Sequence, residues 1–193
     1  GLNMLGSLLF KLIAINGYPL VSNNNQEAAL AEVKEAALAE VRCGTFDLKH
    51  ASTELKNNRE VVKAAVSLEG KGNHLQFAST RLQNDREIVR LAMKFTNFTN
   101  NTFKFASEEL KDDEDFVLEF VSQRIHALVL EYASDKCKKN KKVVLAAVSQ
   151  NGDALQYASA ECKGDQKIVL AAVRHTDQAL EYASEELKDD EDF

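Results

Sequence analysis

The chain has 193 residues, of which 45% are hydrophobic and 28% are charged, so it is long and apolar enough for a folded core and is not disordered throughout. A net charge of −6 argues against a nucleic acid or an anionic membrane as the main partner, because clustered cations carry phosphate binding. One Pro and eight Gly favour helices over tightly turning strands, and three Cys without a C-x-x-C pair favour a reducing compartment over a disulfide framework.

The apolar N-terminal stretch is predicted to be a divergent repeat helix rather than a signal peptide. Residues 8–20 (LLFKLIAINGYPL) align with residues 143–155 (VVLAAVSQNGDAL), and Lys11 interrupts the apolar run. The run is also too short to span a bilayer, so no membrane span is expected.

A short internal duplication follows this stretch. The string EAALAEV at residues 27–33 is repeated at residues 35–41. Both copies have helical periodicity, which predicts one longer helix at about 25–42. Residues 8–45 are therefore expected to form one or more divergent N-terminal units.

Residues 46–193 are predicted to be regular tandem repeats. An aromatic residue followed by Ala-Ser recurs with its Ala at positions 51, 78, 106, 133, 158 and 183, so successive copies are 25 to 28 residues apart. The string ASEELKDDEDF occurs identically at 106–116 and 183–193, which indicates recent duplication. The last unit is incomplete, because its second half would begin where the chain stops.

The first half of each repeat is predicted to be one amphipathic helix. Leu155, Ala158 and Cys162 are spaced i, i+3 and i+7, which places them on one helical face. The small Ala-Ser pair would then lie in mid-helix and let neighbouring helices approach closely. In the last unit this helix would cover Gln178–Lys188.

The second half of each repeat is predicted to be a helix that is buried on two sides, as in Asp165–Val173 (DQKIVLAAV). A short polar residue precedes each of these helices, and we expect it to be the N-cap. These residues are Asn58, Asn84 or Asp85, Asp113, Asn140, Asp165 and Asp190.

The aromatic residue of the repeat motif is expected to belong to the core, because aromatic residues at a fixed repeat position usually do. An exposed ladder for ligand stacking is the alternative. The column consists of His50, Phe77, Phe105, Tyr132, Tyr157 and Tyr182.

These patterns predict an all-α fold, namely an α-solenoid-like stack of short helical hairpins of about 25–28 residues each. One repeat array would cover residues 1–193, and each hairpin would bury its apolar face against the next.

The repeats resemble a known family. The segments LQYASAECKGDQKIVLAAV and LEYASEELKDDEDF are similar to the repeat of domain of unknown function 4116, well over about residues 46–193 and loosely over 8–45. The resemblance implies no activity, cofactor or catalytic residue. It implies a source among unicellular eukaryotes or bacteria that live inside them, so a reducing cytoplasm, including a host cytoplasm, is the favoured compartment.

No catalytic, metal or cofactor site is predicted. Cys137 and Cys162 occupy the position that Leu fills in other repeats, so they are expected to be core residues, and Cys43 lies in a predicted loop. The four His share no repeat position or ligand spacing. The acidic run Glu108–Asp115 lacks the calcium-loop pattern.

The sharpest charge feature is a lysine cluster in an inter-helix turn that is acidic one repeat earlier. In a regular stack the two turns would lie side by side, either as mutual surface attraction or as a charged edge for a protein partner. A nucleic-acid site is not favoured, because no stacking aromatic residues accompany the lysines. The edge comprises Lys136, Lys138, Lys139, Lys141, Lys142, Glu108, Glu109, Asp112 and Asp113.

Three functions remain open. The first is a non-enzymatic scaffold that binds an unknown protein partner, with polar residues that vary between repeats. The second is a spacer or self-association module of a larger protein that acts through the incomplete last unit. The third is an enzyme with a site in the irregular segments 8–45 or 94–104. The varying polar residues are Lys49, Gln76, Lys104, Glu131, Gln156 and Glu181.

Overall fold

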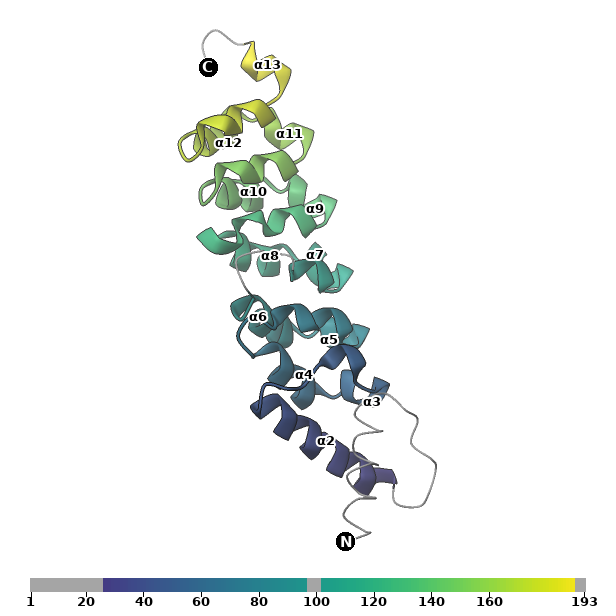
Figure 1. Ribbon diagram of the computed structural model, residues 1–193. Helices are drawn as coiled ribbons and strands as arrows, with labels where there is room; N and C mark the ends of the chain where they lie inside the picture. Colours follow the sequence, from purple (N-terminus) through teal and green to yellow (C-terminus); the bar gives the residue numbers. More distant parts are fainter. Residues whose placement is uncertain (1–25, 97–101, 190–193) are drawn as a thin grey trace. The chain divides into compact units, whose positions relative to one another are not determined.

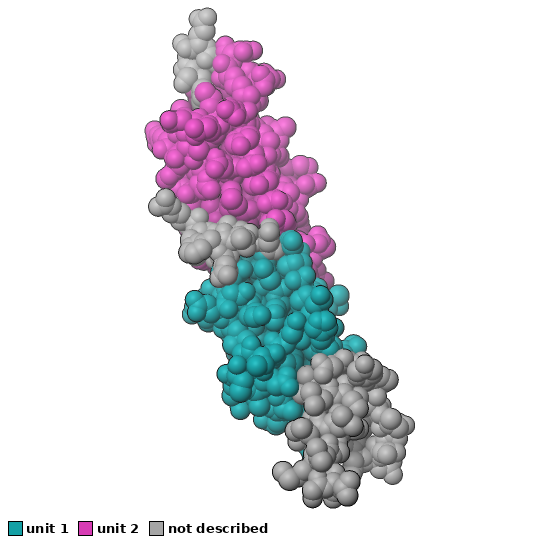
Figure 2. All heavy atoms as spheres, viewed as in Figure 1, with its two compact units in different colours: residues 1–105 teal, residues 106–193 magenta. Residues whose placement is uncertain are grey.

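The computed structural model describes residues 26–96 and 102–189, and every regular element in those ranges is a helix (Figure 1). The predicted all-α class is confirmed. The chain divides into two compact units, residues 1–105 (unit 1) and residues 106–193 (unit 2), shown in different colours in Figure 2. A single array over residues 1–193 stays a prediction.

Within the described residues, unit 1 begins with the long helix α2. After it, each repeat has one short 3-10 helix (η) followed by two α-helices. α2 spans Gln26–Arg42, as the internal duplication predicted. The others are η1 (Leu48–His50), α3 (Thr53–Lys56), α4 (Arg59–Val66), η2 (Gly72–Phe77), α5 (Thr80–Gln83), α6 (Arg86–Lys94) and η3 (Phe103–Phe105).

Unit 2 has the same order of elements. Its elements are α7 (Glu108–Asp112), α8 (Glu114–Val121), η4 (Arg124–Tyr132), α9 (Asp135–Lys139), α10 (Lys141–Val148), η5 (Gly152–Tyr157), α11 (Ala160–Lys163), α12 (Gln166–Val173), η6 (Asp177–Tyr182) and α13 (Glu185–Lys188).

Helix α2 ends in a glycine cap. Gly44 has a φ of 73°, which a residue with a Cβ adopts only with strain. Its amide donates to the Val41 carbonyl over 2.9 Å, and the next amide, of Thr45, donates to the Glu40 carbonyl over 3.1 Å. These two bonds satisfy carbonyls of the last turn and reverse the chain into η1.

The prediction of one continuous helix in the first half of each repeat is wrong. In the repeat at 152–173, Ala158 and Ser159 have extended backbones, with ψ near 158° and 159° respectively, so 3-10 helix η5 ends there and α11 begins after Ser159. The Ser159 hydroxyl accepts a hydrogen bond from the Cys162 amide over 3.3 Å, which makes it an N-cap instead of a small mid-helix residue. The predicted helix at Gln178–Lys188 is likewise two pieces, η6 and α13.

The predicted N-caps of the second helices are confirmed wherever the structure describes them. The side chain of each cap accepts from one or two amides of the first turn, and Asp85, not Asn84, has this role in its repeat. The predicted cap Asp190 lies outside the described residues. The confirmed caps are Asn58, Asp85, Asp113, Asn140 and Asp165.

One main-chain hydrogen bond recurs between consecutive repeats within each unit. The amide of the motif serine donates to the carbonyl of the lysine at the end of the preceding short helix. This bond is 2.9 to 3.0 Å long in every described instance: Ser79 to Lys56 in unit 1, and Ser134 to Lys111, Ser159 to Lys138 and Ser184 to Lys163 in unit 2.

In unit 2 the second helices pack in chain order, α8 on α10 and α10 on α12, with η4, η5 and η6 packed in the same order (Figure 1). Helix α10 buries one face, consisting of Val143, Val144, Ala147 and Val148. Close packing of η5 against α12 depends on glycine, because a Cβ on Gly152 would lie 2.4 Å from the Ala172 carbonyl oxygen of α12. The core of unit 2 is thus continuous from repeat to repeat.

The prediction that the aromatic column lies in the core is wrong. His50 is exposed and the other five aromatic residues are only half-buried. The residue two positions earlier fills the core instead, since Leu75, Leu130 and Leu155 are completely buried.

Candidate functional site

The charged edge predicted from the sequence lies entirely in unit 2. Glu108, Glu109 and Asp112 belong to α7, and Asp113 caps α8. The lysines belong to the equivalent elements of the next repeat, because Lys136, Lys138 and Lys139 are in α9 and Lys141 and Lys142 form the start of α10. Helix α7 packs against α9 and α8 packs against α10, so the two turns are neighbours as expected.

Two of the five lysines are engaged in ion pairs between repeats. The Lys136 Nζ lies 3.8 Å from a carboxylate oxygen of Asp112 and 3.5 Å from one of Glu114. The Lys141 Nζ lies 2.8 Å from Asp165 and 3.8 Å from Glu161, one repeat further along. These contacts support the interpretation of the edge as mutual attraction for part of its residues.

In three repeats the first residue of the second helix contacts the N-cap of the next repeat, and in two of them the contact joins opposite charges. Lys141 lies against Asp165, and its ammonium group lowers the pKa of that carboxyl, helped by the Ile168 and Lys167 amides against the effect of burial. In unit 1, Arg59 donates to Asp85 in the same way, over 2.7 Å.

Where the first residue of the second helix is acidic, the N-cap of the next repeat donates a hydrogen bond to it instead of accepting one. Glu114 stands at the position of Lys141, and the cap that faces it is an amide, Asn140, whose Nδ2 donates to the Glu114 carboxylate over 2.5 Å. A carboxylate cap there would repel Glu114. The first residue of a second helix and the N-cap of the next repeat therefore vary together.

The remaining lysines of the edge are open. Lys139 and Lys142 are exposed and Lys138 is half-buried. Within the part of the chain that the structure describes, none of the three ammonium groups makes an ion pair.

The outer sides of α8, α10 and α12 carry a column of leucines that sequence reasoning assigned to a buried helix. Leu118 and Leu145 are half-buried and Leu170 is 38% exposed, and we call these three residues the leucine column. The prediction that the second helices are buried on two sides is wrong for this face. In unit 1 the same position holds Lys63 on α4 and Arg90 on α6.

A groove runs between α10 and α12 at the last two members of this column. It has a volume of about 290 Å³. We call it the α10–α12 groove, and it is lined by Leu145, Gln166, Lys167, Leu170, Ala171 and Arg174.

Cations border the α10–α12 groove. Lys167 and Arg174 line it and Lys142 lies on the same side of α10, and all three are exposed. In the described ranges 26–96 and 102–189 none of the three forms an ion pair. The apolar floor is thus bordered by uncompensated positive charge, in a chain whose net charge is −6.

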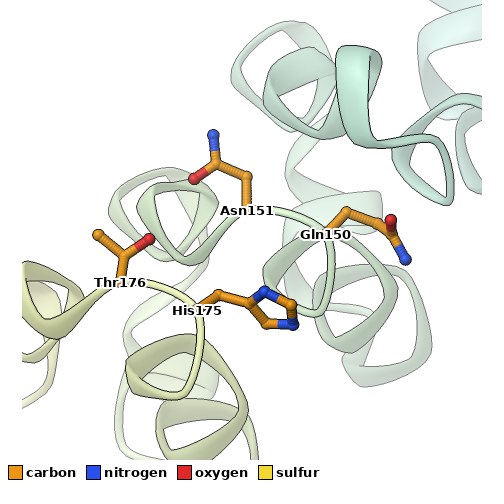
Figure 3. Close-up of a pocket in the computed structure, with 4 residues that line it drawn as sticks. All are labelled: Gln150, Asn151, His175 and Thr176. Carbon is orange, nitrogen blue, oxygen red and sulfur yellow. The ribbon is translucent and has the colours of Figure 1, made fainter.

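A polar pocket of about 380 Å³ lies at the C-terminal ends of α10 and α12, in the loops that follow these helices. Gln150, Asn151, His175 and Thr176 line it, and Figure 3 shows their side chains spreading in different directions instead of converging. Asn151 caps η5 by accepting from the Asp153 amide. His175 is the one ionisable side chain among the described residues that line the pocket.

The half-exposed tyrosines of unit 2 form a second surface feature. Burial, and then hydrogen bonds and charge from Glu131, raise the pKa values of Tyr132 and Tyr157. The charge of one carboxylate thus acts on tyrosines of two successive repeats.

A comparison with protein families gives one match. The model of the family described as domain of unknown function (DUF4116) matches residues 67–101, 97–129 and 124–163, which together cover 97 of the 193 residues. The chain belongs to this family. No curated protein and no solved structure matches the chain.

The cysteines of this DUF4116 chain are placed as predicted. Cys137 and Cys162 are completely buried, and burial raises the pKa of the Cys137 thiol. Cys43 is exposed. No trio of His, Cys, Asp or Glu in residues 26–96 and 102–189 is grouped as metal ligands would be.

Two further observations bear on the functions left open for this family member. Among the described helices, none is both long and apolar enough to cross a lipid bilayer. Of the irregular segments considered for an enzyme site, residues 8–25 and 97–101 lie outside the described residues. Residues 26–45 form α2 and its glycine cap.

Proposed function

We propose that this chain is a non-enzymatic helical-repeat scaffold that binds a protein partner through the outer sides of α8, α10 and α12. The leucine column carries the proposal. A single half-exposed leucine is ordinary on a protein surface, but three at one repeat position form an apolar stripe of the kind that marks interaction sites.

The comparison within the chain strengthens this interpretation. The repeat fold is the same in both units, yet the position of the leucine column holds Lys63 and Arg90 in unit 1. The helix therefore folds with a cation at this position, and leucine is not required for the core. A side chain that the fold does not need and that water disfavours suggests a surface selected for contact.

The test compares the chain with a variant in which Leu118, Leu145 and Leu170 are all replaced by Lys. Lys63, which pairs with Glu87 in unit 1, shows that a lysine fits on this face of the helix, so the variant is expected to keep its helical circular dichroism. Both proteins are immobilised and exposed to lysate, and each captured protein is then purified and its binding measured. We expect the variant to bind about tenfold more weakly or worse.

A control variant, Gln76→Lys, Gln156→Lys and Gln178→Lys, adds the same three charges away from the leucine column and should bind like the original chain. A purified partner that binds the leucine variant and the original chain equally would rule out this surface. Capture of nothing above the bare support would count against a binding function.

Self-association is the second candidate, and one observation favours it. Leu180 on η6 is 38% exposed, whereas Leu130 and Leu155 at the same repeat position are completely buried. Leu180 lines an open pocket of about 570 Å³ together with Gln178, Glu181, Lys188 and Asp177. Sedimentation equilibrium of the original chain and of Leu180→Lys tests it, since a dimer that the substitution abolishes is expected and a strict monomer excludes it.

A further inference from the structure

We infer that the α10–α12 groove binds a short acidic segment of another protein that carries large apolar side chains. This inference rests on the proposed function and specifies the chemistry of the partner. It follows from the juxtaposition of Leu145 and Leu170 with Lys167 and Arg174, which line the groove and form no ion pair within the described residues. Lys142 stands one turn before Leu145 on α10.

The apolar floor of the groove indicates that the partner carries apolar side chains. Leu145, Leu170 and Ala171 present only hydrocarbon between two packed helices. A leucine, methionine or aromatic side chain laid there removes its own surface and that of Leu170 from water, which is the main favourable term in such contacts.

The charged part of the partner is set by the rim. Lys167 stands in the first turn of α12 and Arg174 caps its other end, so the cations bracket the leucines along the helix. Carboxylates on either side of the partner's apolar residues would meet them. In contrast, α8 carries Glu114, Asp115 and Glu119 around Leu118, so the positive rim belongs to α10 and α12 and does not extend to α8.

A phosphate backbone is the less favoured occupant. The groove floor is apolar, no aromatic side chain that could stack on a base lines it, and the chain as a whole is acidic. A second copy of this chain, which could offer its own acidic α8, is the other occupant that the test must separate.

The test selects displayed random peptides of about 16 residues, long enough for four helical turns, on the immobilised full chain. Enriched peptides are expected to contain more Asp and Glu than Lys and Arg, around two or more large apolar residues. The strongest is synthesised with a fluorescent label and its Kd is measured by anisotropy. Enrichment of basic or uncharged peptides would overturn the inference.

A matched pair of variants locates the peptide. Lys167→Glu with Arg174→Glu reverses two charges of the groove and should raise the Kd about tenfold or more, and higher salt should weaken binding to the original chain. Lys138→Glu with Lys139→Glu makes the same change of charge on the edge and should alter the Kd less than about twofold. The reverse pattern would assign the peptide to the edge and overturn the groove, while a binding function would stand.

Two further outcomes name other occupants. A random-sequence RNA oligonucleotide that binds the original chain and not the groove variant would assign the cations to phosphate. A concentration-dependent dimer of the chain alone that the groove variant abolishes would make a second copy the occupant. Either result would overturn the inference, whereas the capture experiment with the leucine variant judges the proposed function separately.

Discussion

At the scale of single residues, glycine is needed at some repeat positions and is only tolerated at others. A Cβ on Gly152 would lie 2.4 Å from the Ala172 carbonyl oxygen and 2.9 Å from the Thr176 Cβ, which are distances that atoms cannot keep. A Cβ on Gly164 would meet nothing nearer than 3.5 Å, and its φ of −95° suits any residue.

Replacement of these two glycines by alanine should therefore have opposite effects. Gly152→Ala forces η5 away from α12 and is expected to lower the free energy of unfolding by about 1–3 kcal/mol. Gly164→Ala restricts the unfolded chain without strain in the folded one and should raise it by about 0.4–1 kcal/mol. Urea unfolding followed by circular dichroism measures both. Equal losses in the two variants would contradict the packing described for Gly152.

His74 is a buried polar residue at a position where two repeats of unit 2 have alanine. It is 8% exposed, and its Nδ1 has no hydrogen-bond partner in the described part of the chain. The equivalent residues Ala154 and Ala179 are completely buried. Burial, and then the charge of Lys71, lower the pKa of His74, against a smaller opposing effect of Asp47.

The lowered pKa of His74 predicts a loss of stability in mild acid. As the pH falls through about 6.5, the unfolded chain takes up a proton on this side chain while the folded chain does not. The free energy of unfolding therefore has its full value above that pH and decreases below it. The fall is at most about 1.4 kcal/mol per pH unit. In His74→Ala this part of the pH dependence should disappear. Urea midpoints measured at several pH values test this, and parallel curves for the two proteins would refute it.

At the scale of helices, the contact between one helix start and the next N-cap predicts a compensated substitution. Lys141→Glu places a carboxylate against Asp165 and should lower the urea midpoint. Asp165→Asn in the same chain should recover part of the loss, because it recreates the pairing of Glu114 with Asn140. The double-mutant cycle isolates this coupling, which should shrink at about 1 M salt. Strictly additive effects would exclude a direct contact.

The broken helix of each repeat shows why the local sequence pattern was only partly informative. Leu155, Ala158 and Cys162 have the spacing of one helical face, and all three are buried, yet the chain is extended at Ala158. A serine hydroxyl can cap the amide three residues on, and this contact together with the bond to the preceding repeat outweighs continuation of the helix. The Asn and Asp caps were predictable because no competing helix pattern ran through them.

The candidate surface was predictable to a smaller degree. The neighbouring acidic and basic turns follow directly from the repeat alignment, since equal positions in adjacent repeats are brought together. The exposure of Leu170 was not predictable, because the run from Ile168 to Val173 reads as apolar on all sides. Only the comparison with Lys63 at the same position of α4 could have indicated that this side faces water.

At the scale of a whole unit, stability should decline from the inner repeats of unit 2 towards its last described helix. Helix α10 buries four of its eight residues, whereas α13 buries none. In stacked repeats each element is stabilised chiefly by the side chains that it buries against its neighbours, so local opening costs least where few side chains are buried. Hydrogen exchange followed by mass spectrometry should show α13 losing protection well before α10. Equal protection of both would mean that unit 2 opens only as a whole.

The main-chain bond from the Ser159 amide to the Lys138 carbonyl bears on how such proteins change length during evolution. Both atoms belong to the backbone, so the joint survives almost any replacement of the lysine side chain and needs no complementary partner. A duplicated repeat brings with it both the serine amide that donates to the repeat before it and the lysine carbonyl that accepts from the repeat after it. Gain or loss of whole repeats can thus precede any adjustment of their surfaces, and the identical strings at 106–116 and 183–193 fit such a history.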